Sequence, residues 1–494
     1  MKRRLRAARR AVPGPLVALL AAVLLTGMAW ALLVPPFQAP DEQSHAGYVQ
    51  SLAEGPGLPG SGARSIFSSE QLAGQDAVNS DQTAGNLLAR TRWGAAAWHA
   101  WERQDARLPD GARGDGGGPN PASSNPPLFY LYDALPYLAA TQADYFARLT
   151  AMRLAAVLWL LVLCTGAWLL AGELLGRDRL LQLVAAAVAG LLPMVAFVSA
   201  QIGPDGMLYA LWSLVLWLGV RILRRGATLA HAVALLGLTG AAILTKATSF
   251  ALLPGVLLAL GVATWRARAD ARRALRLGAA ALAALALPVL VWALVARAVD
   301  HPVAAQISSG PAGGGSGAGS WGDLLSYMWQ FYLPRPPFLD PVNLTGGGFP
   351  AYRIWVLQGW GAFGWLEVRF PDPAYKAFAA VTAAVVVAAL ARLVHAWRRV
   401  VRADAAVPLF IVTVAVALLA GLHWTDYHHV RSGAGPFMQG RYLFPLMPLA
   451  GVAVAGALCW LRGTGRQLAA GAVLGGLVAL QLFSLGLVAV RFYA

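Results

Sequence analysis

The sequence has few charged residues and almost no cysteine, and both shortages exclude large classes of protein. Charged residues make up 13% of the 494 positions, whereas hydrophobic residues make up 58%. This balance excludes an ordinary soluble globular domain. The two cysteines, Cys164 and Cys459, lie in apolar segments and form no C-x-x-C pair. The sequence therefore gives no sign of a disulfide framework or of a cysteine zinc site.

Two further absences narrow the range of functions. No P-loop and no glycine-rich dinucleotide fingerprint are present, so the sequence offers no obvious site for a cytosolic nucleotide. No internal repeat is evident either, which weakens the comparison with transporters built from inverted repeats.

Long apolar runs are what the sequence has in place of charge. By the length needed to cross a hydrocarbon core of about 30 Å, we predict about eleven transmembrane helices. They are expected at 15–34, 151–172, 180–200, 205–223, 229–246, 248–264, 276–298, 375–396, 406–423, 442–461 and 468–490. The pattern predicts an all-α polytopic membrane protein, with residues 1–494 forming a single transmembrane domain.

The formal charge of +16 is distributed along the chain in a way that argues against nucleic acid as a partner. Once the N-terminus is placed inside, every basic cluster falls on the same side of the membrane, as the positive-inside pattern requires. These clusters are Lys2–Arg10, Arg177/Arg179, Arg221–Arg225, Arg266–Arg276, Arg392–Arg402 and Arg462/Arg466. The excess charge then faces anionic lipid. We interpret the first apolar run as a retained anchor rather than a cleaved signal peptide, since no clear cleavage site follows it.

On this topology the first and fourth extracytoplasmic loops, 35–150 and 300–373, are long, and every inner loop is short. The first loop begins with a predicted juxtamembrane helix. Its three closely spaced tryptophans, Trp93, Trp98 and Trp101, are typical of interfacial anchors. The fourth loop contains a glycine-rich linker, Gly310–Gly319.

The segment after the first apolar run holds two adjacent carboxylates and a histidine at a membrane surface. Pro40 suits the first position of a helix, and Asp41 and Glu42 then lie in its first turn. Asp41 and His45 share one face at a spacing of four, and Glu42 can also reach His45. A carboxylate beside an imidazole is suited to activate a hydroxyl. The alternative is that both acids only favour the helix start.

Isolated polar residues stand at the outer ends of other predicted spans. Asp205 follows a Gly-Pro turn, Lys246 lies in an apolar connection, and Arg441 opens the tenth span beside Gln439 and Tyr442. Carboxylates together with cations at one membrane surface suit a lipid-linked phosphate as leaving group. Each residue has an alternative: Asp205 as a helix cap, Lys246 as a snorkelling side chain, and Arg441 as an interfacial anchor.

Several of these segments together resemble the membrane-embedded GT-C glycosyltransferase superfamily, and more closely a bacterial polytopic family of unknown function within it. The resemblance spans most of the chain. It rests on Pro36-x-x-x-Pro40-Asp41-Glu42-x-x-His45, Asn125-Pro126-Pro127-Leu128-Phe129-Tyr130, Gly203-Pro204-Asp205, Thr245-Lys246, Gly364-Trp365-Leu366 and Gln439-Gly440-Arg441-Tyr442-Leu443. Many relatives have His or Lys where this chain has Asn125.

The resemblance implies a glycosyltransferase that uses a polyprenyl-phosphate sugar on the outer face of the bacterial cytoplasmic membrane. It implies Asp41 as the catalytic acidic residue, with Glu42 beside it. The two adjacent carboxylates could exchange roles as the base, and we expect His45 to support them. Substrate binding would fall to Lys246, Arg441, Asp205, Tyr442 and Gln439. Metal dependence varies in the superfamily, so a divalent cation stays open and no metal ligand is assigned. The acceptor, whether glycan, lipid or protein, is not indicated. The alternatives are a flippase for a lipid-linked glycan and a non-catalytic subunit of an envelope-polysaccharide assembly.

Overall fold

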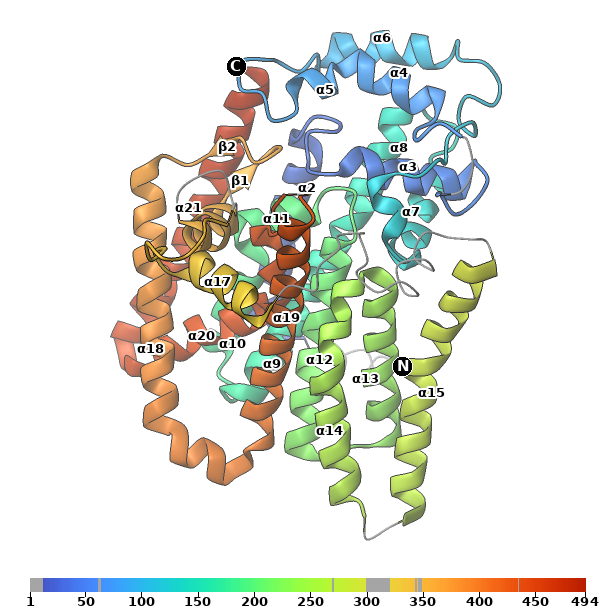
Figure 1. Cartoon of the computed structure of the whole chain (residues 1–494). Coiled ribbons are helices and arrows are strands. Elements are labelled where there is room, and N and C mark those ends of the chain that lie inside the picture. Colours follow the sequence, from blue (N-terminus) through green and yellow to red (C-terminus); the bar gives the residue numbers. More distant parts are fainter. Residues whose placement is uncertain are drawn as a thin grey trace, which may run out of the picture.

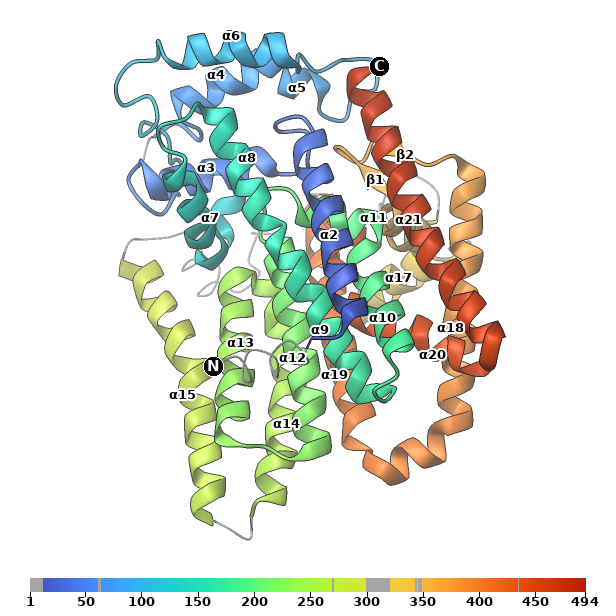
Figure 2. The same cartoon turned by 180° about the vertical axis from the view of Figure 1, so that it is seen from behind.

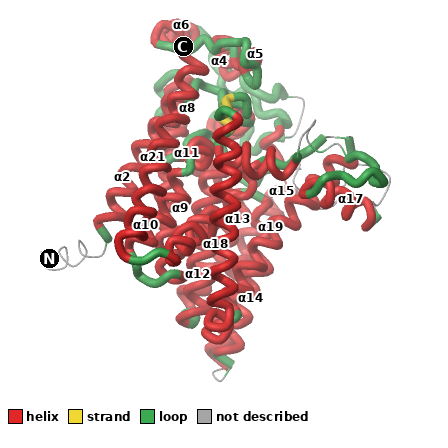
Figure 3. The backbone as a smooth tube through the Cα atoms, turned by 90° about the vertical axis from the view of Figure 1, so that its left-hand side faces the viewer, coloured by secondary structure: helices red, strands yellow, loops and turns green. Residues whose placement is uncertain are grey.

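The computed structural model describes residues 12–60, 64–268, 271–298, 320–342, 344, 349–433 and 435–494. The predicted basic cluster Lys2–Arg10 and the predicted linker Gly310–Gly319 both lie outside the described residues. Nearly all regular structure within them is helical, as Figure 3 shows. The only pairing of strands among the described residues joins β1 (Ala362–Phe363) and β2 (Val368–Arg369), antiparallel. The all-α class predicted from the sequence is confirmed.

The α-helices are α2 (Gly14–Leu33), α3 (Glu42–Ala53), α4 (Ser69–Val78), α5 (Ser80–Thr83), α6 (Ala95–Asp105), α7 (Leu128–Ala139), α8 (Tyr145–Ala156), α9 (Leu158–Leu174), α10 (Arg179–Leu191), α11 (Pro193–Ser199), α12 (Asp205–Arg225), α13 (Leu229–Thr245), α14 (Leu253–Arg266), α15 (Ala271–Ala298), α17 (Trp321–Tyr332), α18 (Asp372–Asp404), α19 (Ala406–Arg431), α20 (Met447–Ala457) and α21 (Gly463–Tyr493). Shorter helical segments are η1 (Pro121–Ser124), η2 (Ala247–Leu252), η3 (Tyr352–Gln358), η4 (Gly440–Leu446) and η5 (Leu458–Trp460).

The described residues contain eight helices that are long and apolar enough to cross a membrane, or nine if the bent pair α10–α11 is one span. These correspond to nine of the predicted spans. The other two, 229–246 and 276–298, coincide with α13 and with the end of α15, which are apolar but shorter. The polytopic class is therefore confirmed, while the predicted count of about eleven is not.

The helices form a bundle with a layer of shorter helices at one end. In Figures 1 and 2, α3, α4, α5 and α6 lie together at that end, and the last turn of α21 reaches them. Arg491 of α21 donates to the backbone carbonyls of Asn86 and Ala89 at 2.8 and 2.9 Å. The end of the last helix thus holds the first loop in place.

Helix α12 is central to the bundle, because most of its residues are buried, from Asp205 at its start to Leu223 near its end. It packs against α9 and α13, and its first residue, Asp205, therefore sits at the centre of one end of the molecule. The preceding pair, α10 and α11, is bent by 57° at Leu192-Pro193, where proline cannot continue the ladder of hydrogen bonds. The bend directs α11 toward the loop at 200–204 that leads into α12.

A buried ionic cluster stabilises the layer of short helices. Arg148 of α8 donates to Glu70 of α4 at 2.5 Å, and both side chains are almost fully buried. Trp101 of α6 is 1% exposed and packs on Phe146. The prediction that Trp101 is an interfacial anchor is therefore wrong, because its indole fills the core between α6 and α8.

Basic residues of separate clusters meet acids at the opposite end of the bundle. Glu173 lies 3.1 Å from Arg221 and 2.8 Å from Arg225, and Asp178 lies 3.2 Å from Arg466. Arg221 and Arg225 belong to one of the basic clusters that the sequence places on one side, and Arg466 belongs to another. Asp178 itself stands between Arg177 and Arg179 of a third cluster, so three clusters gather at one end, away from the layer of short helices.

Candidate active site

Four charged side chains from four separate segments meet at the end of the bundle below the short helices. Asp41 precedes α3, Asp205 begins α12, Lys246 lies between α13 and η2, and Arg441 belongs to η4. Arg441 Nη2 lies 2.5 Å from Asp41 Oδ2, and Lys246 Nζ lies 2.6 Å from Asp205 Oδ1. Arg441 Nε also lies 3.7 Å from Asp205 Oδ2. The structure thus brings together two carboxylates and two cations that the sequence places far apart.

Asp41 has a backbone conformation that frees its side chain for this cluster. Its φ of 64° and ψ of 4° are left-handed, and its carbonyl accepts from the backbone N–H groups of Ser44 and His45 to begin α3. Its carboxylate makes no cap bond to that helix and faces Arg441 instead. Burial raises the pKa of Asp41, but the basic groups around it, Arg441 first among them, together outweigh that effect, so the pKa lies below its usual value.

Asp205 and Lys246 form a buried pair beside the first. The Asp205 side chain is 8% exposed and that of Lys246 is 17% exposed. The Tyr442 ring lies close to both cations, with its centroid 5.2 Å from Lys246 Nζ and 5.7 Å from Arg441 Cζ, distances at which an aromatic face attracts a cation. The N-cap of α12 is Pro204, so Asp205 is the first residue of the helix and not its cap. Its carboxylate instead orients Lys246.

Arg441 retains hydrogen-bonding capacity within the cluster. Its residue is 7% exposed, and its Nε is buried without a hydrogen-bond acceptor. A cavity of about 20 Å³ lies beside it, bordered also by Ala39, Pro40, His45 and Gln201. That volume holds about one water molecule. A buried guanidinium N–H with no acceptor is costly unless a ligand or water completes it.

His45 stands at the edge of the same small cavity. Its Nδ1 shares a hydrogen bond of 2.9 Å with the hydroxyl of Tyr130, whose ring stacks on Tyr48 at 3.7 Å. A Cβ added at Gly203 would lie 3.3 Å from Cδ2 of His45, which is tighter than most such contacts, so this glycine favours the close approach of the 201–204 loop. Burial lowers the pKa of His45 to about 4, although Asp41 favours the protonated form. The imidazole is therefore neutral at pH 7.

Glu42 points away from the cluster and bonds to Arg153 of α8. Arg153 Nε lies 2.7 Å from Glu42 Oε1, and Nη2 lies 2.6 Å from Oε2. Glu42 also accepts the backbone N–H of Phe37 at 2.9 Å and is fully buried. Its oxygens are thus engaged by partners of its own. The structure places Glu42 as the residue that holds the turn carrying Asp41, and it does not bring Glu42 to His45.

A second group of side chains fixes the segment that carries Arg441. Oδ1 of Asp426 accepts the backbone N–H groups of Phe437 and Met438 at 2.6 and 2.8 Å. Its Oδ2 accepts from the hydroxyl of Tyr327 at 2.7 Å. The backbone carbonyl of Gln439 accepts from the N–H of Tyr442 at 3.1 Å, and its side-chain Oε1 is buried without a partner. Gln439 thus shapes the turn before Arg441.

Sequence reasoning missed Arg153, Tyr130 and Asp426 as contributors to this region. Arg153 carried a usable signal, because it lies two residues inside a predicted span, where a charged side chain usually has a functional reason. The partnership between Arg153 and Glu42 gave no local signal, since the two residues are 111 positions apart. Among the described residues, no group of three or more His, Cys, Asp or Glu side chains is arranged to hold a metal ion.

Comparison with known proteins gives a family and a set of structural likenesses. The family model described as "Predicted membrane protein (DUF2142)" matches residues 24–450. No curated protein matches the sequence.

Two solved structures illustrate the structural likenesses. ArnT from Cupriavidus metallidurans, bound to undecaprenyl phosphate, is 15% identical with a TM-score of 0.43, over 94% of this chain and 62% of that one. The oligosaccharyltransferase AglB from Archaeoglobus fulgidus, in complex with an inhibitory peptide and a dolichol-phosphate, is 11% identical with a TM-score of 0.48, over 97% of this chain and 56% of that one. The chain thus spans less than two thirds of the length of either solved chain.

Proposed function

We propose that this chain, which belongs to the DUF2142 family of predicted membrane proteins, is a glycosyltransferase that takes a sugar from a polyprenyl-phosphate donor. The acceptor is a hydroxyl of a glycan, lipid or protein. We place the reaction at the outer face of the bacterial cytoplasmic membrane, where the one-sided basic clusters put the layer of short helices. The observation that carries the proposal is the meeting of Asp41 with Asp205, Lys246 and Arg441, three residues that stand at or next to the ends of candidate spans.

Lys246 and Arg441 are the phosphate-binding pair in this proposal. A guanidinium group has five N–H donors, and the structure gives Arg441 side-chain hydrogen bonding to Asp41 while leaving its Nε without an acceptor. Phosphate oxygens are suitable acceptors for such a group, in bidentate geometry. Lys246, held by Asp205 beside the same site, adds a second positive charge for the leaving phosphate.

Asp41 is the general base, and its bond to Arg441 has to open before it can act. A carboxylate whose pKa is lowered by an adjacent guanidinium is a weak base. When the donor phosphate takes the place of the Asp41 carboxylate on Arg441, Asp41 loses that stabilisation and becomes more basic. The same exchange would enlarge the site, which in this structure has room for about one water molecule.

The reaction then follows a single displacement with inversion. The acceptor oxygen forms a bond to the anomeric carbon while the bond from that carbon to the phosphate oxygen breaks. The acceptor proton passes to Asp41, and the electron pair leaves with the polyprenyl phosphate, whose added charge Lys246 and Arg441 neutralise. Neutral His45, bonded to Tyr130, orients groups at the edge of the site.

A flippase for a lipid-linked glycan is the rival function. A flippase is expected to have ionisable residues near the middle of the membrane. The charges of this site instead stand at span ends: Asp205 is the first residue of α12, and Arg441 is the second residue of the candidate span Gly440–Trp460. This position favours an enzyme at the membrane surface.

Incubation of the purified protein with polyprenyl-phosphate sugars labelled in the sugar tests the proposal. We expect loss of donor and release of polyprenyl phosphate with at least one sugar when membrane extract supplies the acceptor. The Asp41→Asn variant is the control for background hydrolysis. Transbilayer movement of the donor in proteoliposomes, without release of polyprenyl phosphate, would support the flippase instead.

A further inference from the structure

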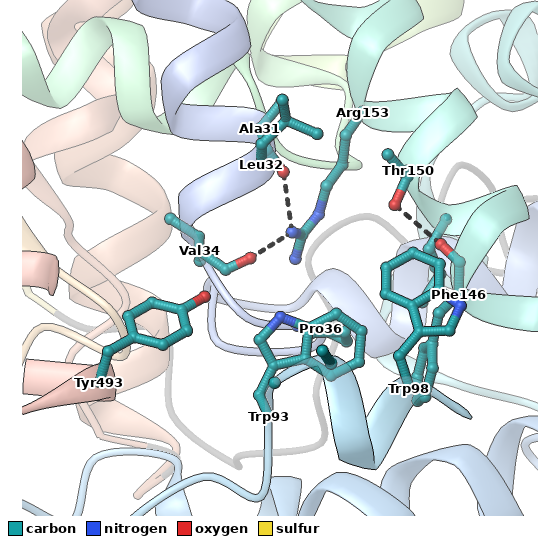
Figure 4. A pocket seen from close by; sticks show the side chains of 13 residues that line it. Ala31, Leu32, Val34, Pro36, Trp93, Trp98, Phe146, Thr150, Arg153 and Tyr493 are labelled. Carbon is teal, nitrogen blue, oxygen red and sulfur yellow. Dashed lines mark hydrogen bonds between the residues drawn. The ribbon is translucent and has the colours of Figure 1, made fainter. Parts of the chain in front are cut away.

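A second cavity lies apart from the four charged side chains, on the other side of the turn that carries Asp41. Its volume is about 250 Å³. Figure 4 shows the rings of Trp93, Trp98 and Phe146 around it, with Arg153 and Val34 on its border. Pro36 lines this cavity, whereas Ala39 and Pro40 line the small cavity beside Arg441. The two cavities therefore flank one short turn.

Apart from the indole N–H groups of Trp93 and Trp98, the polar side chains that line the large cavity are already bonded to the protein. The five N–H groups of Arg153 match five acceptor contacts, to both oxygens of Glu42 and to the carbonyls of Ala31, Val34 and Pro35. The hydroxyl of Thr150 donates to the carbonyl of Phe146, and that of Tyr493 donates to the carbonyl of Leu33. A polar ligand such as a sugar would therefore find few free donors, whereas an apolar ligand needs none.

The position of the cavity indicates the source of such a ligand. It lies where the candidate span Gly14–Leu33 ends and the candidate span Tyr145–Leu174 begins, between the last turn of α2 and the first turns of α8. Leu32, which lines it, is 55% exposed, and Leu25 on the same helix is 66% exposed. The lining is thus continuous with the surface that α2 presents to membrane hydrocarbon. Trp93 and Trp98 cover it from the first loop, as indole rings do at an interface.

We propose that this cavity binds an acyl chain of a membrane phospholipid from the leaflet beside the layer of short helices. The chain packs against the aromatic rings and Leu149, and burial of apolar surface supplies the affinity. The donor's polyprenyl chain is a poorer fit, since its phosphate is assigned to Lys246 and Arg441 on the far side of the turn. The bound chain supports the turn at residues 34–36, which Arg153 also holds.

Photocrosslinking with a phospholipid tests this assignment without any measurement of transfer activity. The full chain is reconstituted in nanodiscs that contain phosphatidylethanolamine with a diazirine on one acyl chain, irradiated, digested and mapped by mass spectrometry. We expect labelled peptides at 93–98 and 146–150, in addition to the generally exposed face of α18.

Two variants fill the cavity, and one matched variant does not. Thr150→Phe places a ring in the cavity, and we expect labelling at 93–98 to fall at least fivefold while labelling of α18 is unchanged. Thr165→Phe is the control, because Thr165 also bonds to the carbonyl four residues before it, on α9 away from the cavity. Ala95→Phe, at an exposed position of the lining, serves if Thr150→Phe does not give a monodisperse protein.

Two outcomes overturn the proposal. Equal labelling at 93–98 in the wild type and in both filling variants would show that the lipid only touches the surface. Labelling of these peptides by a diazirine polyprenyl phosphate but not by the phospholipid would assign the cavity to the donor chain instead.

Discussion

The guanidinium of Arg441 donates to the carboxylate of Asp41 across 400 residues of sequence, with 2.5 Å between Nη2 and Oδ2. The pair joins the start of α3 to η4, so that the proposed base and the proposed phosphate ligand restrain each other. A donor phosphate competes with Asp41 for the same cation. Donor binding and base activation are therefore one event in the proposed mechanism.

Asp41→Asn is expected to abolish transfer while leaving the fold intact. Asparagine tolerates the left-handed conformation found at this position, but its amide cannot take a proton from the acceptor. We expect a rate lower by about 10²–10⁴-fold, measured as release of polyprenyl phosphate. Wild-type turnover in this variant would remove Asp41 as the base.

Glu42→Gln is expected to lower the stability of the fold, whereas Asp41→Asn is expected to lower the rate of transfer. The change leaves Arg153 buried without its charged partner, which typically costs about 3–5 kcal/mol. Thermal unfolding in detergent, followed by intrinsic fluorescence, measures the loss. Glu102→Gln is the matched control, since the Glu102 side chain pairs with His99 but is 47% exposed, and such pairs contribute about 0–1 kcal/mol. Equal stability of the two variants would contradict the structural role of Glu42.

Lys246→Ala is expected to weaken binding of polyprenyl phosphate. Loss of a hydrogen bond to a charged group costs about 1.5–3 kcal/mol, or roughly 10–150-fold in affinity. Because the single variant also leaves Asp205 without its closest cation, Lys246→Ala with Asp205→Asn is the control that keeps the site neutral. Arg441→Lys should also bind less tightly, since the planar fork is lost. Native mass spectrometry measures the affinity of each variant for polyprenyl phosphate. Unchanged affinity in all three variants would indicate that Lys246 and Arg441 are side chains anchored at the membrane interface and do not bind the phosphate.

His45 is expected to make the protein less stable as the pH falls below about 6.5. Its pKa is lowered to about 4 in the folded state from 6.5, so the unfolded chain binds the proton more readily between these values. Stability is therefore complete above pH 6.5 and declines toward pH 4, by about 3 kcal/mol in total. The apparent Tm of the wild type should fall more than that of His45→Gln between pH 7 and pH 4.5. Parallel curves would show that His45 does not titrate in this way.

Asp426→Ala is expected to raise KM for the donor more than it lowers kcat. The change removes the acceptor of the Phe437 and Met438 N–H groups and so loosens the segment before Arg441. Asp426→Asn keeps an oxygen for those groups and should restore most of the donor affinity. An equal loss in both variants would point to the charge of Asp426 rather than to its positioning role.

Much of the architecture could be predicted because hydropathy reports membrane crossing directly. The 205–223 run became α12 and the 15–34 run became α2 with small shifts at their ends. The end of α3 before Gly55 was also predictable from a local signal. The predicted start at Pro40 was wrong, because Asp41 is a left-handed N-cap and α3 begins at Glu42. The bend within the 180–200 run was harder to predict, although Pro193 lies at the bend.

The candidate site was predictable as a set of residues and not as a set of contacts. Span ends and motif resemblance selected Asp205, Lys246 and Arg441, and these do meet. Helical periodicity predicted Asp41 and His45 on one face of a helix, whereas Asp41 precedes α3 as its N-cap. It could not show that Asp41 is left-handed or that Glu42 belongs to Arg153, because both depend on packing between segments far apart in sequence.

The bonds from Arg491 to the carbonyls of Asn86 and Ala89 have a consequence for biosynthesis. Their partners are up to 405 residues apart, and a ribosome adds about 5–20 residues per second. In the proposed topology, the first loop therefore waits about 20–80 s on the outer side of the membrane for the helix that fastens it. During that interval its short helices depend on their own ionic cluster around Glu70, and they are the part of the nascent chain most open to proteases and chaperones.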